Sequence, residues 1–272
     1  MLVRVMTFNI RNCIADDGTN SWEFRKRLLA RAIEDEAPDV MGLQEVFYRQ
    51  REFLARALPQ YEQFGEHRGG GRESEAALLC YLHERFSLLE GGNVWLSDTP
   101  EVAGSKTWGN RNVRMATWAR LRRRDDGARF FVVNCHLDHQ AELARRKGAA
   151  QLCDLVRDRA GEDPAILMGD FNAWPHTPAY QLLTGELDWD GTRGELHDAW
   201  EIAAERPEDT RTFHGWGEMG EVGEQARIDW IMVRPRLEVV RVTRPTYREG
   251  DRLPSDHYPV VAEVSLRADG EQ

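Results

Sequence analysis

The alternation of hydrophobic and polar residues divides the chain into predicted strands, helices and loops. Strands are predicted where apolar residues alternate with polar ones or form uninterrupted runs, at residues 2–10, 39–45, 75–81, 94–97, 115–121, 129–136, 165–169, 227–233 and 260–266. Helices are predicted where apolar residues recur at helical spacing, at 21–37, 48–58 and 142–160. The turn Asp125-Asp126-Gly127 between two of the strands indicates a hairpin. The glycine-rich segments 185–194 and 215–223 are expected to be loops.

One predicted strand ends in a way that suggests chemistry. The apolar run 165–169 stops at Gly169 and is followed by Asp170 and Asn172. Alternate residues of an extended chain point the same way, so both side chains can face one cavity. Pro175 then prevents the strand from continuing. Glycine, aspartate and asparagine also favour turns, so this stretch alone does not decide between a turn and a site.

Composition places the chain among ordinary globular proteins. It has 272 residues, of which 41% are hydrophobic and 30% charged. This length allows one large domain or two small ones. Polar residues at strand ends come from the whole chain, so we expect residues 1–272 to form a single domain on two packed sheets. No apolar run approaches the eighteen or so residues of a membrane span, and we expect no membrane association.

Charge and cysteine usage narrow the functional classes. The net charge of -10 argues against a tight, sequence-independent grip on a polyanion. Lysine occurs only at positions 26, 106 and 147, and we read no function into the excess of arginine. The four cysteines are scattered, which favours reduced thiols over disulfides or a zinc site. The chain starts with a strand-like segment instead of a secretory signal, so a cytoplasmic location is expected.

Polar residues recur at or just beyond the ends of the predicted strands. They are Asn9, Glu45, His136, Asp138, Asp170, Asn172, Asp229, Asp256 and His257. Each has an ordinary explanation when taken alone: Glu45 suits a helix N-terminus, and Asp229 suits an ion pair with Arg227. Their repetition along the whole chain is harder to explain in this way. Carboxylates, amides and histidines without a thiolate cluster suit an oxygen-ligated cation, Mg²⁺ or Mn²⁺.

These residues fall into motifs whose order and approximate spacing resemble a known superfamily. The motifs are Thr7-Phe8-Asn9-Ile10, Gln44-Glu45, Asn134-x-His136, Gly169-Asp170-Phe171-Asn172, Ile228-Asp229 and Ser255-Asp256-His257. The chain resembles the endonuclease/exonuclease/phosphatase superfamily, the deoxyribonuclease-I-like metal-dependent phosphoesterases. Segments 20–23, 95–100 and 136–139 look like a bacterial hydrolase branch related to the deadenylase and nocturnin side.

The resemblance implies a fold and a set of metal ligands. The expected fold is a four-layer α/β/β/α sandwich, in which two mixed sheets face each other and helices lie outside. Glu45 matches the main metal ligand of the family, Asn9 matches a polar neighbour of the metal, and Asp256 sits beside it. The expected cofactor is Mg²⁺, with Mn²⁺ as an alternative.

The resemblance also implies catalytic roles. Asp170 orients and deprotonates the attacking water with help from Asn172, while His136 and His257 donate hydrogen bonds to the phosphoryl oxygens. Asp229 matches the acid that orients His257. By analogy with related nucleases, Glu75 is expected to hydrogen-bond His136. Asp138 and His139 lie outside the shared core, and we expect them to contact substrate. Because an adjacent anion favours the charged form of an imidazole, histidines held by carboxylates are expected to stay positive more readily.

Three functions remain open at this point. The leading one is an Mg²⁺-dependent phosphoesterase that hydrolyses a phosphate mono- or diester by in-line attack of an activated water. A second is a DNA endonuclease or RNA 3′ exonuclease, in which aromatic residues stack on bases: Trp174, Phe213, His214 and Trp216. A third is an inactive binding or scaffold protein, which would have no need to keep this set of acids and histidines.

Substrate size is predicted from the loops between the motifs. Four of them carry a tryptophan, at positions 108, 174, 189 and 216. Tryptophan-bearing loops at the mouth of such a site more often line a pocket for a compact ligand than a track for a polymer. We therefore expect a small phosphorylated molecule or a short oligonucleotide end as substrate, with no protein partner.

Overall fold

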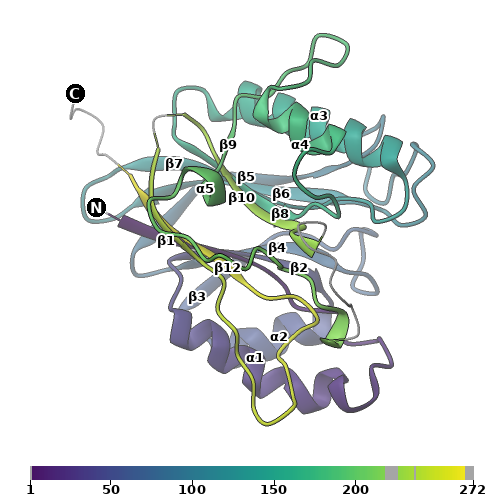
Figure 1. The fold of residues 1–272 in the computed structure, drawn as a ribbon, viewed down its shortest axis with the longest axis vertical. Helices are drawn as coiled ribbons and strands as arrows, with labels where there is room; N and C mark the ends of the chain where they lie inside the picture. The colour runs from purple at the N-terminus through teal and green to yellow at the C-terminus, as the bar shows by residue number, and fades with distance from the viewer. Residues whose placement is uncertain (1, 218–225, 236, 267–272) are drawn as a thin grey trace.

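Two six-stranded sheets pack face to face and carry helices on their outer surfaces (Figure 1). The computed structural model describes residues 2–217, 226–235 and 237–266. Helices α1 (Trp22–Glu36) and α2 (Tyr48–Ala57) cover one sheet, while α3 (Glu142–Ala160) and α4 (Pro178–Thr184) cover the other (Figure 1). The predicted four-layer α/β/β/α sandwich is confirmed.

The first sheet contains both ends of the described chain. In spatial order its strands are β11 (Glu238–Thr243), β12 (Val260–Ser265), β1 (Leu2–Asn9), β2 (Val40–Val46), β4 (Ala76–Leu82) and β3 (Tyr61–Phe64). Strands β1 and β2 run parallel, with α1 between them in the chain, and the other neighbours are antiparallel. Because β1 and β2 are parallel, their carboxyl ends meet at one edge, where Asn9 lies opposite Gln44.

The second sheet repeats this plan. Its strands in spatial order are β5 (Phe86–Trp95), β6 (Met115–Arg123), β7 (Arg129–His136), β8 (Ala165–Asp170), β10 (Asp229–Val233) and β9 (His197–Asp198). Strands β7 and β8 are parallel, with α3 as the crossover, and His136 lies opposite Asp170. Strand β10 is antiparallel to β8 and starts beside the end of β8, so that Asp229 also lies opposite Asp170.

Apolar side chains fill three layers, and a polar link joins the two sheets. One cluster lies between the sheets, one under α1 and α2, and one under α3 and α4. Near the strand ends, Gln44 Nε2 donates to Asn134 Oδ1 at 2.7 Å across the sheets. Asn134 Nδ2 donates to the carbonyls of Leu43 and Leu78, each at 3.0 Å. Gly42 is needed for this approach, since a Cβ there would lie 2.7 Å from Asn134. The sheets are thus held in a fixed relation beside the strand ends.

Several elements differ from the predictions. Strand β5 begins well before the predicted 94–97, and β10 begins at Asp229 instead of Arg227. Strands β3, β9 and β11 and helix α4 were not predicted. Of the predicted loop 215–223, residues 218–223 lie outside the described residues. Within the described ranges, no helix combines the length and the apolar character that crossing a membrane requires.

Candidate active site

The ends of β1, β2, β7 and β8 and the start of β10 converge on one cavity of about 340 Å³. The predicted residues that line it are Glu45, Glu75, His136, His139, Asp170, Asn172, Asp256 and His257. The other lining residues are Arg11, Asn12, Arg68, Asn112, Arg114, Phe213 and Ile228. Of the remaining predicted residues, Asn9, Asp138 and Asp229 are buried beside the cavity wall, whereas Trp174 is 40% exposed.

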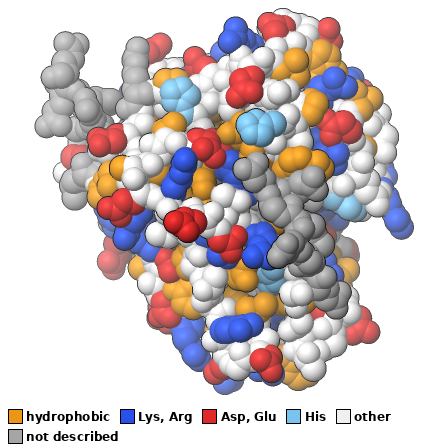
Figure 2. All heavy atoms as spheres, viewed as in Figure 1, with side chains coloured by type: hydrophobic (Ala, Val, Ile, Leu, Met, Phe, Trp, Pro, Cys, Tyr) orange, Lys and Arg blue, Asp and Glu red, His pale blue; other side chains and the backbone are white. Residues whose placement is uncertain are grey.

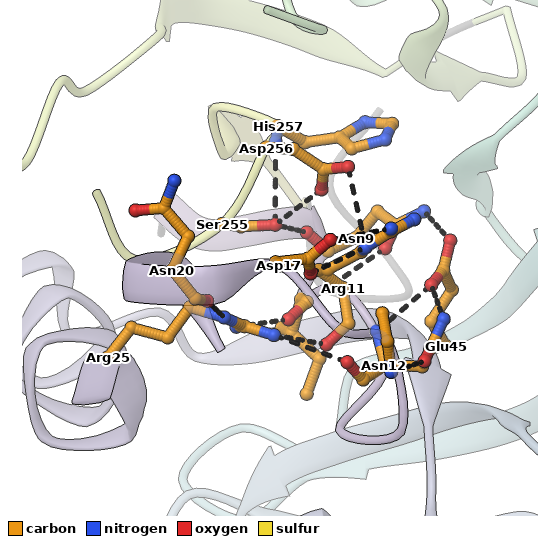
Figure 3. A network of polar contacts seen from close by, with 12 residues as sticks. Asn9, Arg11, Asn12, Asp17, Asn20, Arg25, Glu45, Ser255, Asp256 and His257 are labelled. Carbon is orange, nitrogen blue, oxygen red and sulfur yellow. Dashed lines mark hydrogen bonds and ion pairs between the residues drawn. The ribbon is translucent and has the colours of Figure 1, made fainter. Parts of the chain in front are cut away.

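Asn9 joins the two acids that the resemblance puts at the centre of the chemistry. Its Nδ2 donates to Glu45 Oε1 at 3.1 Å and to Asp170 Oδ2 at 2.9 Å. The second Glu45 oxygen accepts from the Asn12 amide at 2.9 Å and from Asn12 Nδ2 at 2.8 Å (Figure 3). Burial raises the pKa of Glu45, but these hydrogen bonds outweigh it, and the pKa lies below the ordinary 4.5. Glu45 is therefore a carboxylate at neutral pH.

The backbone is strained at three residues of the site. Arg11, Glu45 and Asn172 have positive φ angles of 51°, 62° and 47°. Such conformations cost on the order of 1–3 kcal/mol each for residues with a side chain, and they cluster at functional sites. Glu45 also lies within an irregularity of the β2–β4 pairing, between Leu43 and Val46. The local fold thus directs the Glu45 carboxylate into the cavity at an energetic cost.

A second charged group is built around His257. Its Nδ1 lies 2.9 Å from Asp229 Oδ2, and its Nε2 lies 3.9 Å from Asp170 Oδ2. Burial lowers the pKa of His257, but the nearby charges of Asp229, Asp170 and Asp256 raise it to about 10. Burial raises the pKa of Asp170 to about 7, and the charge of Asp229 acts in the same direction. His257 is therefore a cation at neutral pH, next to an acid that titrates there.

His136 is in a different electrostatic state from His257. Its Nε2 lies 3.4 Å from Asp170 Oδ2. Burial and the positive charges of Arg114 and Arg68 lower the pKa of His136 well below its usual value. The pKa of His257 thus favours the charged imidazole, whereas that of His136 favours a neutral imidazole, which can still donate a hydrogen bond.

The predicted hydrogen bond between Glu75 and His136 is also wrong. Glu75 Oε2 instead lies 2.6 Å from Arg68 Nη1, and no Glu75–His136 ion pair or hydrogen bond exists among the described residues. The backbone explains this choice of partner, because the Arg68 amide donates to the Glu75 carbonyl at 2.8 Å. The backbone therefore holds Arg68 and Glu75 side by side, which brings their side chains together.

The donor set of the cavity fits a hard cation. Among the described residues, one group of acids and histidines has ligand atoms within 4.8 Å of one another: Asp170, Asp229 and His257. This group differs from the predicted ligands. A protonated His257 cannot ligate, so its part in the group is an ion pair. Asp229 Oδ1 is buried and has no hydrogen-bond partner among the described residues, and Glu45 and Asp256 add carboxylates at the same cavity. Buried acids at this density need a cation.

The tryptophans do not line the cavity as predicted. Trp108 is buried in the core beneath α3 and α4, and Trp189 packs against that core. Trp216 lies against the Arg25 guanidinium, 5.6 Å from ring centroid to Cζ. None of them, nor Trp174, is among the described residues that line the cavity. The aromatic residue that does line it is Phe213, whose ring lies 4.7 Å from that of His257.

Comparisons with known proteins identify the family. A model of the Endonuclease/Exonuclease/phosphatase family matches residues 6–257. An endonuclease/exonuclease/phosphatase from Bacteroides vulgatus is 33% identical, with a TM-score of 0.91, over 98% of this chain and 100% of that one. A Bacteroides thetaiotaomicron structure described as a mannosyl-6-phosphatase is 30% identical, with a TM-score of 0.87, over 97% of this chain and 100% of that one.

Nocturnin from Drosophila melanogaster is 27% identical over an alignment of 288 positions that covers 90% of this chain and 42% of that protein. The chain spans about a third to three fifths of the length of the curated relatives it matches. The family match covers nearly the whole chain, so the protein belongs to the endonuclease/exonuclease/phosphatase family. Members of this family are metal-dependent hydrolases of phosphate esters.

Proposed function

We propose that the chain acts as a single domain that hydrolyses a phosphate ester of a small molecule, with Mg²⁺ as cofactor. The observation that carries this proposal is the junction of Glu45, Asn9 and Asp170 through hydrogen bonds of 3.1 and 2.9 Å in one cavity. The proposed cation ligand, Glu45, and the proposed general base, Asp170, thus lie at one cavity. A phosphate ester repels hydroxide, so its hydrolysis needs both charge neutralisation and a base.

Glu45 would hold the cation, with Asn9 and Asp256 beside it. When bound, the ion would neutralise phosphoryl charge and act as a Lewis acid. The geometry of the chain prepares this site in advance, since Asn9 and Asn12 fix both Glu45 oxygens. Burial, together with the charge of Glu45, raises the pKa of Asp256, while the positive charges of His257 and Arg11 act in the opposite direction.

Asp170 would accept the proton of the attacking water. A general base works best with a pKa near the working pH, and the pKa of Asp170 is about 7. Asn172 holds this carboxylate through its amide, which donates to Asp170 Oδ1 at 2.9 Å. The new bond joins the water oxygen to phosphorus as the bond to the leaving oxygen breaks. Charged His257, oriented by Asp229, and neutral His136 would donate to the phosphoryl oxygens.

The size and charge of the cavity favour a compact substrate. Its volume of about 340 Å³ lies at the lower end of the range for small-molecule sites. On the face seen in Figure 2, acidic and basic side chains are interspersed, and the described residues there form no continuous basic band. A polymer track would need such a band. The neighbour described as a mannosyl-6-phosphatase is consistent with a small substrate. Exposed Trp174, placed just after Asn172, is the feature that favours the nuclease alternative.

A substrate screen tests the proposal. Sugar phosphates, nucleotides, lipid head groups and short RNA would be incubated with and without Mg²⁺, using Asp170→Asn as the inactive control. We expect Mg²⁺-dependent release of phosphate or alcohol from a small substrate. Fastest degradation of long RNA or DNA would favour the nuclease, and no turnover of any phosphate ester would contradict the proposal.

A further inference from the structure

Two arginines that have no part in the mechanism above lie at the cavity beside His136. Arg114 immediately precedes β6, and Arg68 lies between β3 and β4. Strand β6 is antiparallel to β7, with Met115 opposite His136, so Arg114 is carried to the catalytic end of β7. A narrow crevice is lined by both arginines together with Glu45 and His136. Both cations are therefore neighbours of the reacting groups and do not belong to a remote patch.

Arg114 is held in place with most of its donors unused. Its side chain is 5% exposed, and its Nε lies 3.7 Å from Asp138 Oδ2 without a hydrogen bond to any described residue. Its Nη2 lies 3.0 Å from His139 Nδ1, which is its single hydrogen bond within the described part of the chain. A guanidinium has five N–H donors. Nε is the guanidinium nitrogen that is buried without a partner, and leaving it so is costly unless a ligand accepts from it.

Arg68 is held by an ion pair with Glu75. Its Nη1 lies 2.6 Å from Glu75 Oε2, and the two side chains are 17% and 14% exposed. The backbone bond between the same two residues fixes the start of the side chain as well. One edge of the guanidinium is thus occupied by Glu75, and the rest is available to the cavity that Arg68 lines.

We propose that Arg68 and Arg114 recognise a terminal phosphate group and thereby select phosphate monoesters over diesters. This inference rests on the proposed phosphoesterase function. At neutral pH a monoester phosphate carries a charge of about -1.5 to -2 and three free oxygens, whereas a diester carries a single charge and has two such oxygens. Guanidinium groups match phosphate oxygens in geometry and charge. The two arginines supply donors for the additional oxygen and charge, which neutral His136 cannot do alone.

The test compares p-nitrophenyl phosphate with bis(p-nitrophenyl) phosphate in the wild type and in Arg114→Gln. A charge-assisted hydrogen bond that is lost should lower kcat/KM for the monoester roughly 10- to 100-fold. The value for the diester should change less than about threefold, since that substrate lacks the third free oxygen. Arg114→Lys, which keeps the charge with fewer donors, should fall between the wild type and Arg114→Gln. Arg111→Gln is the matched control, because Arg111 is exposed and does not line the cavity.

A second variant guards against misfolding of the first. Arg68→Gln combined with Glu75→Gln removes both charges of the pair and should show the same selective loss for the monoester. Equal losses for both esters, or a wild-type preference for the diester, would overturn the inference while the phosphoesterase function stands. If the wild type cleaves neither ester, the affinity of each variant for inorganic phosphate in the presence of Mg²⁺ tests the arginine subsite instead. A tenfold weaker affinity in Arg114→Gln than in Arg111→Gln supports the subsite, and equal affinities overturn it.

Discussion

Replacing Asp170 by asparagine should abolish turnover and stabilise the metal-free protein at high pH. The pKa of this buried carboxyl is about 7 in the folded state, against an ordinary 3.8. A raised folded-state pKa means that the ionised form destabilises the fold. This cost is absent below pH 3.8, grows as the pH rises, and is complete above pH 7. At about 1.4 kcal/mol per pKa unit, it amounts to about 4 kcal/mol.

The stabilisation expected for Asp170→Asn is partly offset, because the carboxamide cannot keep all the hydrogen bonds that the carboxylate accepts. Asp170 accepts from Asn9 Nδ2 and from the Asn172 amide on different oxygens, each at 2.9 Å. A carboxamide has one acceptor oxygen, so one of the two bonds is lost at a cost of about 1–3 kcal/mol. The net expectation for Asp170→Asn at pH 8 is a gain of about 1–3 kcal/mol in the free energy of unfolding. At pH 4 the wild-type carboxyl is already mostly protonated, and the gain should disappear.

Urea unfolding followed by circular dichroism in EDTA, at pH 8 and at pH 4, measures this difference. Exposed Asp251→Asn is the control for the same chemical change at the surface. Turnover of Asp170→Asn with Mg²⁺ should fall by about two to four orders of magnitude, as expected for loss of a general base. A folded variant with near-wild-type kinetics would remove Asp170 from the mechanism. A stability change that is the same at both pH values would refute the electrostatic argument.

Three further predictions concern the metal, the loop behind it and the substrate. Glu45→Gln should raise the Mg²⁺ concentration needed for half-maximal activity by roughly tenfold or more, with a loss of stability of about 1–3 kcal/mol because one carboxamide oxygen cannot accept from both Asn9 and Asn12; an unchanged Mg²⁺ titration would exclude Glu45 as the ligand. Arg25→Met should lower the free energy of unfolding by about 2–4 kcal/mol, because the buried guanidinium donates to the carbonyls of Ile10 and Pro254 at 2.7 and 2.9 Å; equal urea midpoints for variant and wild type would contradict this. Substrate affinity should fall with salt with a log–log slope near -1, since each phosphate contacted on a single strand contributes about 0.7, whereas a slope of -4 or steeper would point to a polymer substrate.

The order of most strands and helices along the chain could be predicted from the sequence, because the two kinds of element give different periodicities of apolar residues. Strand β9 has two residues and no period to detect. Strand β11 lies in a segment rich in arginine and flanked by Pro235 and Pro245, which hid its alternation. Helix α4 begins at Pro178 and has seven residues, which is too short for a clear helical periodicity. Such elements are fixed by packing against neighbours distant in the chain, and local sequence does not record that packing.

The acids and histidines of the cavity could be found from the sequence because most of them lie beside a strand terminus within short polar motifs. The arginines were missed because Arg114 stands before a strand, and only the antiparallel pairing of β6 with β7 carries it to the same edge. Glu75 was placed correctly at the cavity but paired with the wrong residue, since its partner is set by a loop backbone bond to Arg68.

The most direct test of the central claim is metal-dependent hydrolysis by the purified wild-type chain. Release of p-nitrophenol from p-nitrophenyl phosphate and from bis(p-nitrophenyl) phosphate would be followed during titration with Mg²⁺ and, in parallel, with Mn²⁺. EDTA would then be added to remove the metal ion. Asp170→Asn and Glu45→Gln would be run at equal concentration. We expect turnover that rises with Mg²⁺, stops with EDTA, and is lost in Asp170→Asn. Turnover that is equal with and without divalent cation, or equal in Asp170→Asn, would contradict the account.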